Sequence, residues 1–173
     1  EIRLQTALEN DLLCPFHYFG IQDLVIDENP QEIKDFKRLT SDERVRQIIK
    51  AAEYYGYSGE CVRGLIFCSK KDEAKELSDK FNETGLYKTV FLCGETPQVE
   101  RERAIGRLTA PKSDPNRLDY IFTVDIFNEG VDIPEINQVI MLRPTESAII
   151  FVQQLGRGLR KSAGKEYVVI IDF

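Results

Sequence analysis

Two arginines near the end of the sequence, Arg157 and Arg160, are the side chains best suited to bind a charged ligand. They stand three residues apart in the segment 153–160, QQLGRGLR. A guanidinium group is always charged, and its planar set of N–H donors fits phosphate oxygens. Glycines on both sides of Arg157 let the backbone turn or approach a ligand closely. On spacing alone, however, the favoured interpretation is a pair of ordinary cations at a helix end, bound to the helix dipole or to surface carboxylates.

A second segment that could take part in binding or catalysis is residues 123–134, TVDIFNEGVDIP, which directly follows an apolar strand pattern. Gly130 permits an unusual backbone angle, and Pro134 ends regular structure. Asp132 lies between two apolar residues, so we expect it to accept a hydrogen bond from a donor such as a hydroxyl group. The alternative is a rigid Asx-type turn before the next strand, and without further context it is the favoured interpretation.

The elements that must position these segments alternate between apolar strands and helices. The expected strands are apolar almost throughout, at residues 64–68, 89–93, 118–124, 139–142 and 167–171. The expected helices show capping residues or apolar positions at helical spacing, at residues 40–55, 72–81, 98–108 and 147–155. Apolar strands need cover on both faces, so the pattern predicts a mostly parallel sheet in an α/β domain. Functional groups in such sheets collect in the loops after the strands.

Composition and charge exclude several classes of protein. The net charge of −6 argues against binding nucleic acid by bulk charge alone, although a local basic groove remains compatible with it. No apolar run approaches the ~20 residues of a membrane span, and nothing resembles a signal peptide. The four cysteines form no CxxC pair, so no metal site is expected. Cys68 and Cys93 fall in apolar strand patterns and read as core thiols, which favours a reducing, cytoplasmic setting.

The first part of the chain, residues 1–35, differs in pattern from the rest. Residues 16–19 and 23–27 are strand-like, and Gly20 between them predicts a turn, so a short hairpin is possible there. A hairpin of this kind is marginal alone and needs a surface on which its aromatic side chains can pack. We expect the single histidine, His17, to belong to such an aromatic cluster rather than to act as a ligand or base.

Four segments, in this order, resemble the motifs of a known family. Residues 64–74 (GLIFCSKKDEA) look like helicase motif IV, 94–104 (GETPQVERERA) like motif IVa, 123–134 like motif V and 153–160 like motif VI. Together they resemble the second, C-terminal RecA-like domain of superfamily 2 DEAD/DEAH-type helicases, close to bacterial restriction-type (type III restriction subunit-like) helicases. The resemblance implies a three-layer RecA-like (P-loop NTPase-like) domain over residues 36–173, preceded by a connector from a first motor domain at residues 1–35.

The resemblance also implies a nucleotide site. Arg160 would be the finger that reaches the γ-phosphate of ATP, with Arg157 in support, because such a cation stabilises charge that develops during phosphoryl transfer. Gln153 would help to align the finger or the attacking water. Gly130 and Asp132 would bind ATP, Asp132 through the ribose.

Four further residues would contact the phosphates of a nucleic-acid strand: Ser69, Gly94, Thr96 and Thr123. Their hydroxyl and backbone N–H groups are uncharged donors, which hold a phosphate backbone without reading its sequence. Donors of this kind explain how an acidic domain could still bind nucleic acid, and DNA is the favoured substrate.

The departures from a complete motor are equally informative. The sequence has no GxxxxGK[ST] loop, and none of its Asp-Glu pairs ends an apolar strand as a DExx box does. The parts that hold Mg²⁺ and the β-phosphate of ATP are therefore expected in a first RecA-like domain that precedes Glu1, and this chain alone is not expected to hydrolyse ATP. Two alternatives remain: the motor part of a restriction enzyme subunit, and a non-catalytic interaction module derived from a helicase domain.

Overall fold

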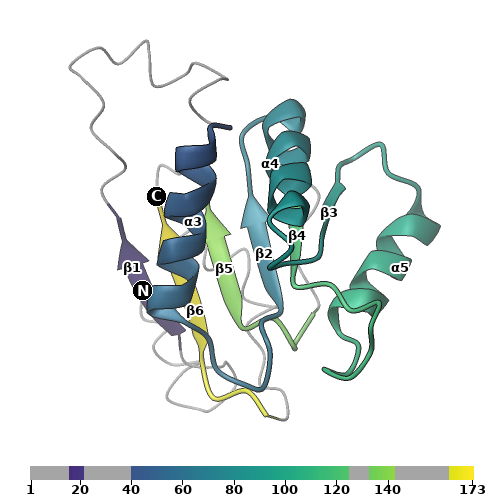
Figure 1. The fold of residues 1–173 in the computed structure, drawn as a ribbon. Helices are drawn as coiled ribbons and strands as arrows, with labels where there is room; N and C mark the ends of the chain where they lie inside the picture. Colours follow the sequence, from purple (N-terminus) through teal and green to yellow (C-terminus); the bar gives the residue numbers. More distant parts are fainter. Residues whose placement is uncertain (1–15, 22–39, 125–132, 143–163) are drawn as a thin grey trace, which may run out of the picture.

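The computed structural model describes residues 16–21, 40–124, 133–142 and 164–173, which form a parallel sheet with helices packed against it (Figure 1). The sheet has six strands in the order β1-β6-β5-β2-β4-β3, and every pair of neighbours is parallel. The strands are β1 (Phe16–Gly20), β2 (Gly64–Phe67), β3 (Thr89–Leu92), β4 (Tyr120–Thr123), β5 (Gln138–Met141) and β6 (Val168–Asp172). The helices are α3 (Asp42–Tyr55), α4 (Lys71–Glu83) and α5 (Gln98–Leu108).

The predicted strands and helices of this part of the chain are confirmed, with differences of a few residues at their ends. Helix α3 begins after Ser41, whose side chain accepts a hydrogen bond from the backbone N–H of Arg44 at 3.1 Å. It ends at Gly56, which adopts a φ of 67° that favours glycine and donates its N–H to Ala52 O at 3.0 Å. The predicted helix at 147–155 lies outside the described residues.

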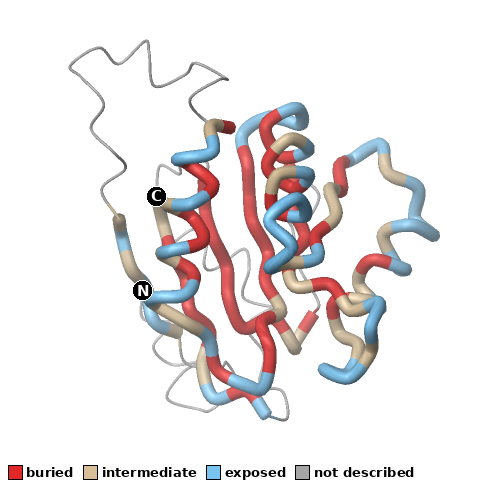
Figure 2. The backbone as a smooth tube through the Cα atoms, in the orientation of Figure 1, coloured by how far each residue is buried: buried red, intermediate tan, exposed pale blue. Residues whose placement is uncertain are grey.

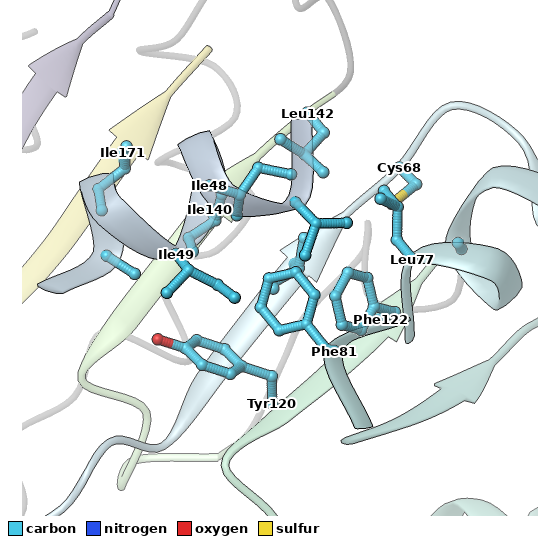
Figure 3. Packing of buried hydrophobic residues seen from close by; sticks show 14 of the residues in the cluster. Ile48, Ile49, Cys68, Leu77, Phe81, Tyr120, Phe122, Ile140, Leu142 and Ile171 are labelled. Atoms are coloured by element: carbon cyan, nitrogen blue, oxygen red, sulfur yellow. The ribbon is translucent and has the colours of Figure 1, made fainter. Parts of the chain in front are cut away.

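The core lies on both faces of the sheet (Figure 2), as expected for strands that are apolar throughout. One face packs against α3 and α4, where Phe81 meets Phe122 edge to face with 5.0 Å between ring centroids (Figure 3). On the other face, Leu108 of α5 joins Leu65 and other strand residues in a second cluster. Helix, sheet and helix therefore form the predicted three-layer α/β arrangement. Cys68 and Cys93 are buried, as expected for core thiols.

Strand β1 differs from the expectation of a separate hairpin. It forms the edge of the main sheet, paired in parallel with β6 from Phe16 opposite Val168 to Gly20 opposite Asp172. Its aromatic side chains find their packing surface there, because Phe19 stacks on Tyr55 of α3 with 4.3 Å between ring centroids. The predicted second strand at 23–27 and the boundary between residues 35 and 36 lie outside the described residues.

His17 on β1 packs edge to face against Tyr167, with 4.6 Å between ring centroids, so its predicted place in an aromatic cluster is confirmed. In the part of the chain that the structure describes, no helix is long and apolar enough to span a membrane. The same residues contain no group of three or more side chains suited to hold a metal ion.

Candidate nucleic-acid interface

The residues predicted to contact strand phosphates come together at the carboxyl ends of three adjacent strands. The sheet order places β4 between β2 and β3, and Thr123 of β4 lies opposite Phe67 of β2 and Leu92 of β3. The loops that carry Ser69 and Gly94 therefore leave the sheet on either side of Thr123. Three segments from different parts of the sequence converge on one edge, the arrangement that places functional loops in parallel α/β sheets.

Ser69 lies in the exposed turn between β2 and α4, beside the exposed Lys70. The backbone groups of both residues lie close enough to the carboxylate of Glu73, in the first turn of α4, to lower its pKa, while Glu73 Oε2 has no hydrogen-bond partner among the described residues. Both residues are exposed, so a phosphate could meet the hydroxyl of Ser69 and the ammonium group of Lys70. The buried Glu73 therefore lies on the inner side of the turn between β2 and α4.

Glu73 itself is almost completely buried, with 1% of its surface exposed. Burial raises its pKa, and Arg44 of α3 together with the hydrogen bonds from Ser69 and Lys70 opposes that rise. The sequence analysis did not select Glu73. A usable signal exists, however, because an acidic residue in the first turn of a helix is a common acceptor for free backbone N–H groups.

The loop after β3 is a tight turn in which Thr96 N–H donates to Cys93 O at 3.0 Å. The hydroxyl of Thr96 accepts the N–H of Cys93 at 3.0 Å and donates to Cys93 Sγ at 3.7 Å. This hydroxyl is thus engaged inside the turn in this conformation. Gly94 is exposed, and no atom lies within 4 Å of the position that a Cβ would take. The open surface at Gly94 is therefore where a strand could approach the backbone of this loop.

Arg101 on α5 holds the same loop from the helix side. Its Nε donates to Thr96 O at 2.9 Å, and its Nη2 donates to Gly94 O at 2.6 Å. One planar guanidinium group thereby fixes two carbonyl groups, and hydrogen bonds from a charged donor are stronger than neutral ones. Arg101 lies within the motif-like segment 94–104 but was not selected from the sequence, because its partners are backbone atoms that no residue pattern identifies.

An ion pair connects the two loops. Lys71 Nζ lies 2.7 Å from Glu95 Oε1, with 50% and 81% of the two side chains exposed. The hydrogen bond between them raises the pKa of Lys71 and lowers the pKa of Glu95. The ammonium group of Lys71 is thus paired with a carboxylate on the same surface.

Thr123 is fully buried between these loops at the end of β4. Its Oγ1 atom has no hydrogen-bond partner among the described residues, which is uncommon for a buried hydroxyl. Direct contact with a phosphate would require this hydroxyl to become accessible, and its predicted role stays a prediction.

The profile of the family described as "Helicase conserved C-terminal domain" matches residues 39–162, which is more than half of the chain. The chain belongs to this helicase C-terminal domain family.

Individual relatives agree with that assignment. The protein IRC3 of Saccharomyces cerevisiae is 32% identical over 109 residues, which are 63% of this chain and 15% of that protein. The ATP-dependent RNA helicase SrmB of Haemophilus influenzae is 26% identical over 166 residues, 92% of this chain and 36% of that helicase. This helicase C-terminal domain therefore spans well under half the length of these relatives.

Solved structures confirm the RecA-like fold. The ATP-dependent type ISP restriction-modification enzyme LlaBIII, solved bound to DNA, aligns with 95% of this chain and 12% of that enzyme, at a TM-score of 0.64 and 22% identity. The Escherichia coli DEAD-box protein SrmB, solved with the regulator RraA, aligns with 92% of this chain and 76% of that chain, at a TM-score of 0.58 and 20% identity.

The residues expected at the nucleotide lie in the segments 125–132 and 143–163, outside the described part of this helicase C-terminal domain. They are Gly130, Asp132, Gln153, Arg157 and Arg160. Their roles remain predictions from the motif resemblance.

Proposed function

We propose that this chain is the C-terminal motor domain of an ATP-dependent helicase or translocase that acts on nucleic acid, with DNA as the favoured substrate. The observation that carries the proposal is the convergence of the Ser69 and Gly94 loops at the carboxyl ends of β2 and β3, which flank β4. Both loops are exposed, and both are fixed from beneath by side chains bound to their backbones. A fixed pair of loops suits repeated contacts with a regular phosphate backbone.

The charge of the surface supports contacts of this kind. The net charge of −6 disfavours binding by many basic side chains, and Lys71 at the interface is paired with Glu95. Binding would therefore rest on the Ser69 hydroxyl, the Gly94 backbone and Lys70. A small number of phosphate contacts predicts weak binding by this domain alone, because each neutralised phosphate adds to affinity through counterion release.

On the nucleotide side, Arg160 would act as the arginine finger, with Arg157 in support and Gln153 aligning the finger or the water. Gly130 and Asp132 would contact ATP. The chain has no phosphate-cradling GxxxxGK[ST] loop. The Mg²⁺ ion and the β-phosphate would therefore be held by a preceding RecA-like domain, in a cytoplasmic protein.

We favour DNA over RNA because the motifs resemble those of restriction-type helicases; LlaBIII, which shares the fold, was solved bound to DNA, and the relative SrmB is an RNA helicase. The same likeness favours, as a second candidate, the motor part of a restriction enzyme. Nuclease activity on DNA by the complete protein would distinguish that candidate from a helicase without a nuclease.

The test is ATP hydrolysis by the complete protein and by the isolated 173-residue chain, each with oligo(dT), with oligo(U) and without nucleic acid. We expect the complete protein to be stimulated by nucleic acid, more by oligo(dT) than by oligo(U), and the isolated chain to be inactive. Hydrolysis by the isolated chain would contradict the half-motor proposal. A complete protein without ATPase activity would instead favour the non-catalytic interaction module.

A further inference from the structure

A pocket of about 380 Å³ lies at the opposite end of the sheet, where α3 ends. We call it the α3 pocket. It is lined by the last turn of α3 and by residues one or two positions before three neighbouring strands, Val62 before β2, Tyr87 before β3 and Asp119 before β4. The candidate nucleic-acid interface lies at the carboxyl ends of the same strands, so the two sites are separated by the length of the sheet (Figure 1). The volume of the α3 pocket falls in the ~300–1,000 Å³ range of ligand sites.

Aromatic rings and carboxylates dominate the lining of the α3 pocket. Tyr57 is 39% exposed, and the partly buried Tyr87 packs edge to face on the buried Tyr120 at 5.4 Å between ring centroids. The exposed side chains of Glu53 and Glu60 line the same pocket. The hydroxyl of Tyr87 donates to Glu53 Oε1 at 3.3 Å.

The electrostatic surroundings of these rings are negative. Burial, Glu53, Asp119 and Tyr57 together raise the pKa of Tyr87 to about 12. Of these causes, the carboxylates of Glu53 and Asp119 disfavour an anion and favour a cation, whereas burial disfavours a charge of either sign. The faces of tyrosine rings also attract a cation, and a guanidinium group can stack on them.

The end of α3 adds to this negative potential. A helix carries a partial negative charge at its carboxyl end, which basic side chains usually offset. Helices α4 and α5 have Lys80 and Arg107 in their last turns, whereas α3 has no basic residue there and carries Glu53. The amide of Gln138 donates to the carbonyl groups of Ala52 and Gly56, so these α3 carbonyls are bound by an uncharged group.

Two basic residues of this chain also line the α3 pocket, and they do not cancel its charge. Arg117 forms a short ion pair with Asp119 at 2.7 Å, with 14% and 15% of the two side chains exposed, and also donates to Val62 O and Leu118 O. This pair is neutral as a unit. Lys112, on the exposed loop after α5, contributes one positive charge to the lining. The exposed carboxylates of Glu53 and Glu60 contribute two negative charges.

We propose that the α3 pocket binds an arginine side chain presented by a partner protein. The guanidinium group would stack on Tyr57 and donate to the carboxylates of Glu53 and Glu60, and it would supply the cation that the end of α3 lacks. This inference is independent of the proposed motor function, because none of the lining residues belongs to the candidate nucleic-acid interface.

The test is a titration of the ¹⁵N-labelled chain, followed by NMR, with N-acetyl-L-arginine methylamide. N-acetyl-L-citrulline methylamide is the matched probe, because citrulline has the same shape without the charge. We expect weak, saturable shifts of the amides of Gly56, Tyr57 and Tyr87 with the arginine probe and no saturation with the citrulline probe. Glu60→Gln and Tyr57→Leu should each weaken binding of the arginine probe by roughly two- to fivefold.

The control variant is Glu43→Gln, which removes an exposed carboxylate at the other end of the same helix and should leave binding of the arginine probe unchanged. Retained dispersion of the amide spectra shows that each variant is folded. Equal shifts with the two probes, or unchanged affinity in Glu60→Gln, would overturn the proposal. Equal or tighter binding of N-acetyl-L-lysine methylamide would overturn the assignment to a guanidinium group.

Discussion

The two ends of the central sheet use charged side chains in different ways. At the carboxyl end, Glu73 and Arg101 bind backbone groups of the loops, and Lys71 is paired with Glu95. At the amino end, carboxylates of Glu53 and Glu60 stand exposed beside aromatic rings. Most charged groups at the carboxyl end therefore fix loop shape, with Lys70 left exposed, whereas the carboxylates of Glu53 and Glu60 at the amino end remain available to a partner. The difference predicts that variants at the two ends will fail in different assays.

The largest effect is expected for Arg160→Ala in the complete protein. If Arg160 is the arginine finger, ATP turnover stimulated by oligo(dT) should fall by ~10³-fold or more, because the charge that develops on the transferring phosphoryl group loses its cation. The melting temperature should stay close to that of the wild type. Arg103→Ala, which removes an exposed arginine of α5, is the matched control. Near-normal turnover in Arg160→Ala would show that Arg160 is not the arginine finger. It would not affect the comparison between the carboxyl and amino ends of the sheet.

A smaller effect is expected for Arg101→Ala. The variant loses the hydrogen bonds to Gly94 O and Thr96 O, so the loop after β3 loses its fixed shape. We expect affinity for fluorescein-labelled oligo(dT), measured by anisotropy, to fall roughly tenfold, which corresponds to about 1.4 kcal/mol. Arg101→Lys should recover only part of this loss, because an ammonium group cannot hold both carbonyls in the same fork. If Arg101→Ala binds as the wild type does, loop shape is not what the carboxyl end contributes.

Glu73→Gln tests the buried charge at the carboxyl end through pH. The folded-state pKa of Glu73 is raised above the ordinary value of 4.5, so the folded protein binds this proton more tightly than the unfolded chain does. The free energy of unfolding of the wild type should therefore fall, relative to the variant, as pH rises from 4.5 through the folded-state pKa. Urea unfolding of both proteins between about pH 4 and pH 7 measures this difference.

The control for Glu73→Gln is Glu102→Gln, which removes a carboxylate from the exposed surface of α5. A stability difference between Glu73→Gln and the wild type that stays constant with pH would show that burial does not penalise the charge of Glu73. The carboxyl end would then resemble the amino end, where the carboxylates are exposed.

The sequence predicted the elements better than their partners. Residues 64–68 are apolar without interruption, which requires burial on both faces and predicts a central strand. The sequence carries no signal for the pairing partner of β1. The partner, β6, lies about 150 residues away, and parallel pairing leaves no local turn pattern. Sheet order and the edge position of β1 therefore came only from the structure.

The same limit applies to the candidate site. The sequence identified Ser69 and Gly94 because they follow apolar strands, and the sheet brings their loops to one edge. It did not identify Arg101 or Glu73, because both bind backbone groups rather than matching side chains. It also could not show that the hydroxyl of Thr96 is engaged within its own turn, since the partner is the backbone of Cys93. The α3 pocket was missed for a related reason, because its lining comes from several separate segments.

The smallest effect is expected for Ser69→Ala, and it gives the sharpest comparison with a charged neighbour. Loss of one neutral hydroxyl contact should weaken oligo(dT) binding by roughly two- to fivefold, the scale of a single hydrogen bond. The slope of log affinity against log salt should stay unchanged, because no phosphate charge loses its counterpart. Lys70→Gln should instead lower that slope by about 1, since one fewer counterion is released. A salt slope that changes in Ser69→Ala would contradict a neutral phosphate contact by Ser69. A slope that stays constant in Lys70→Gln would contradict a charged phosphate contact by Lys70.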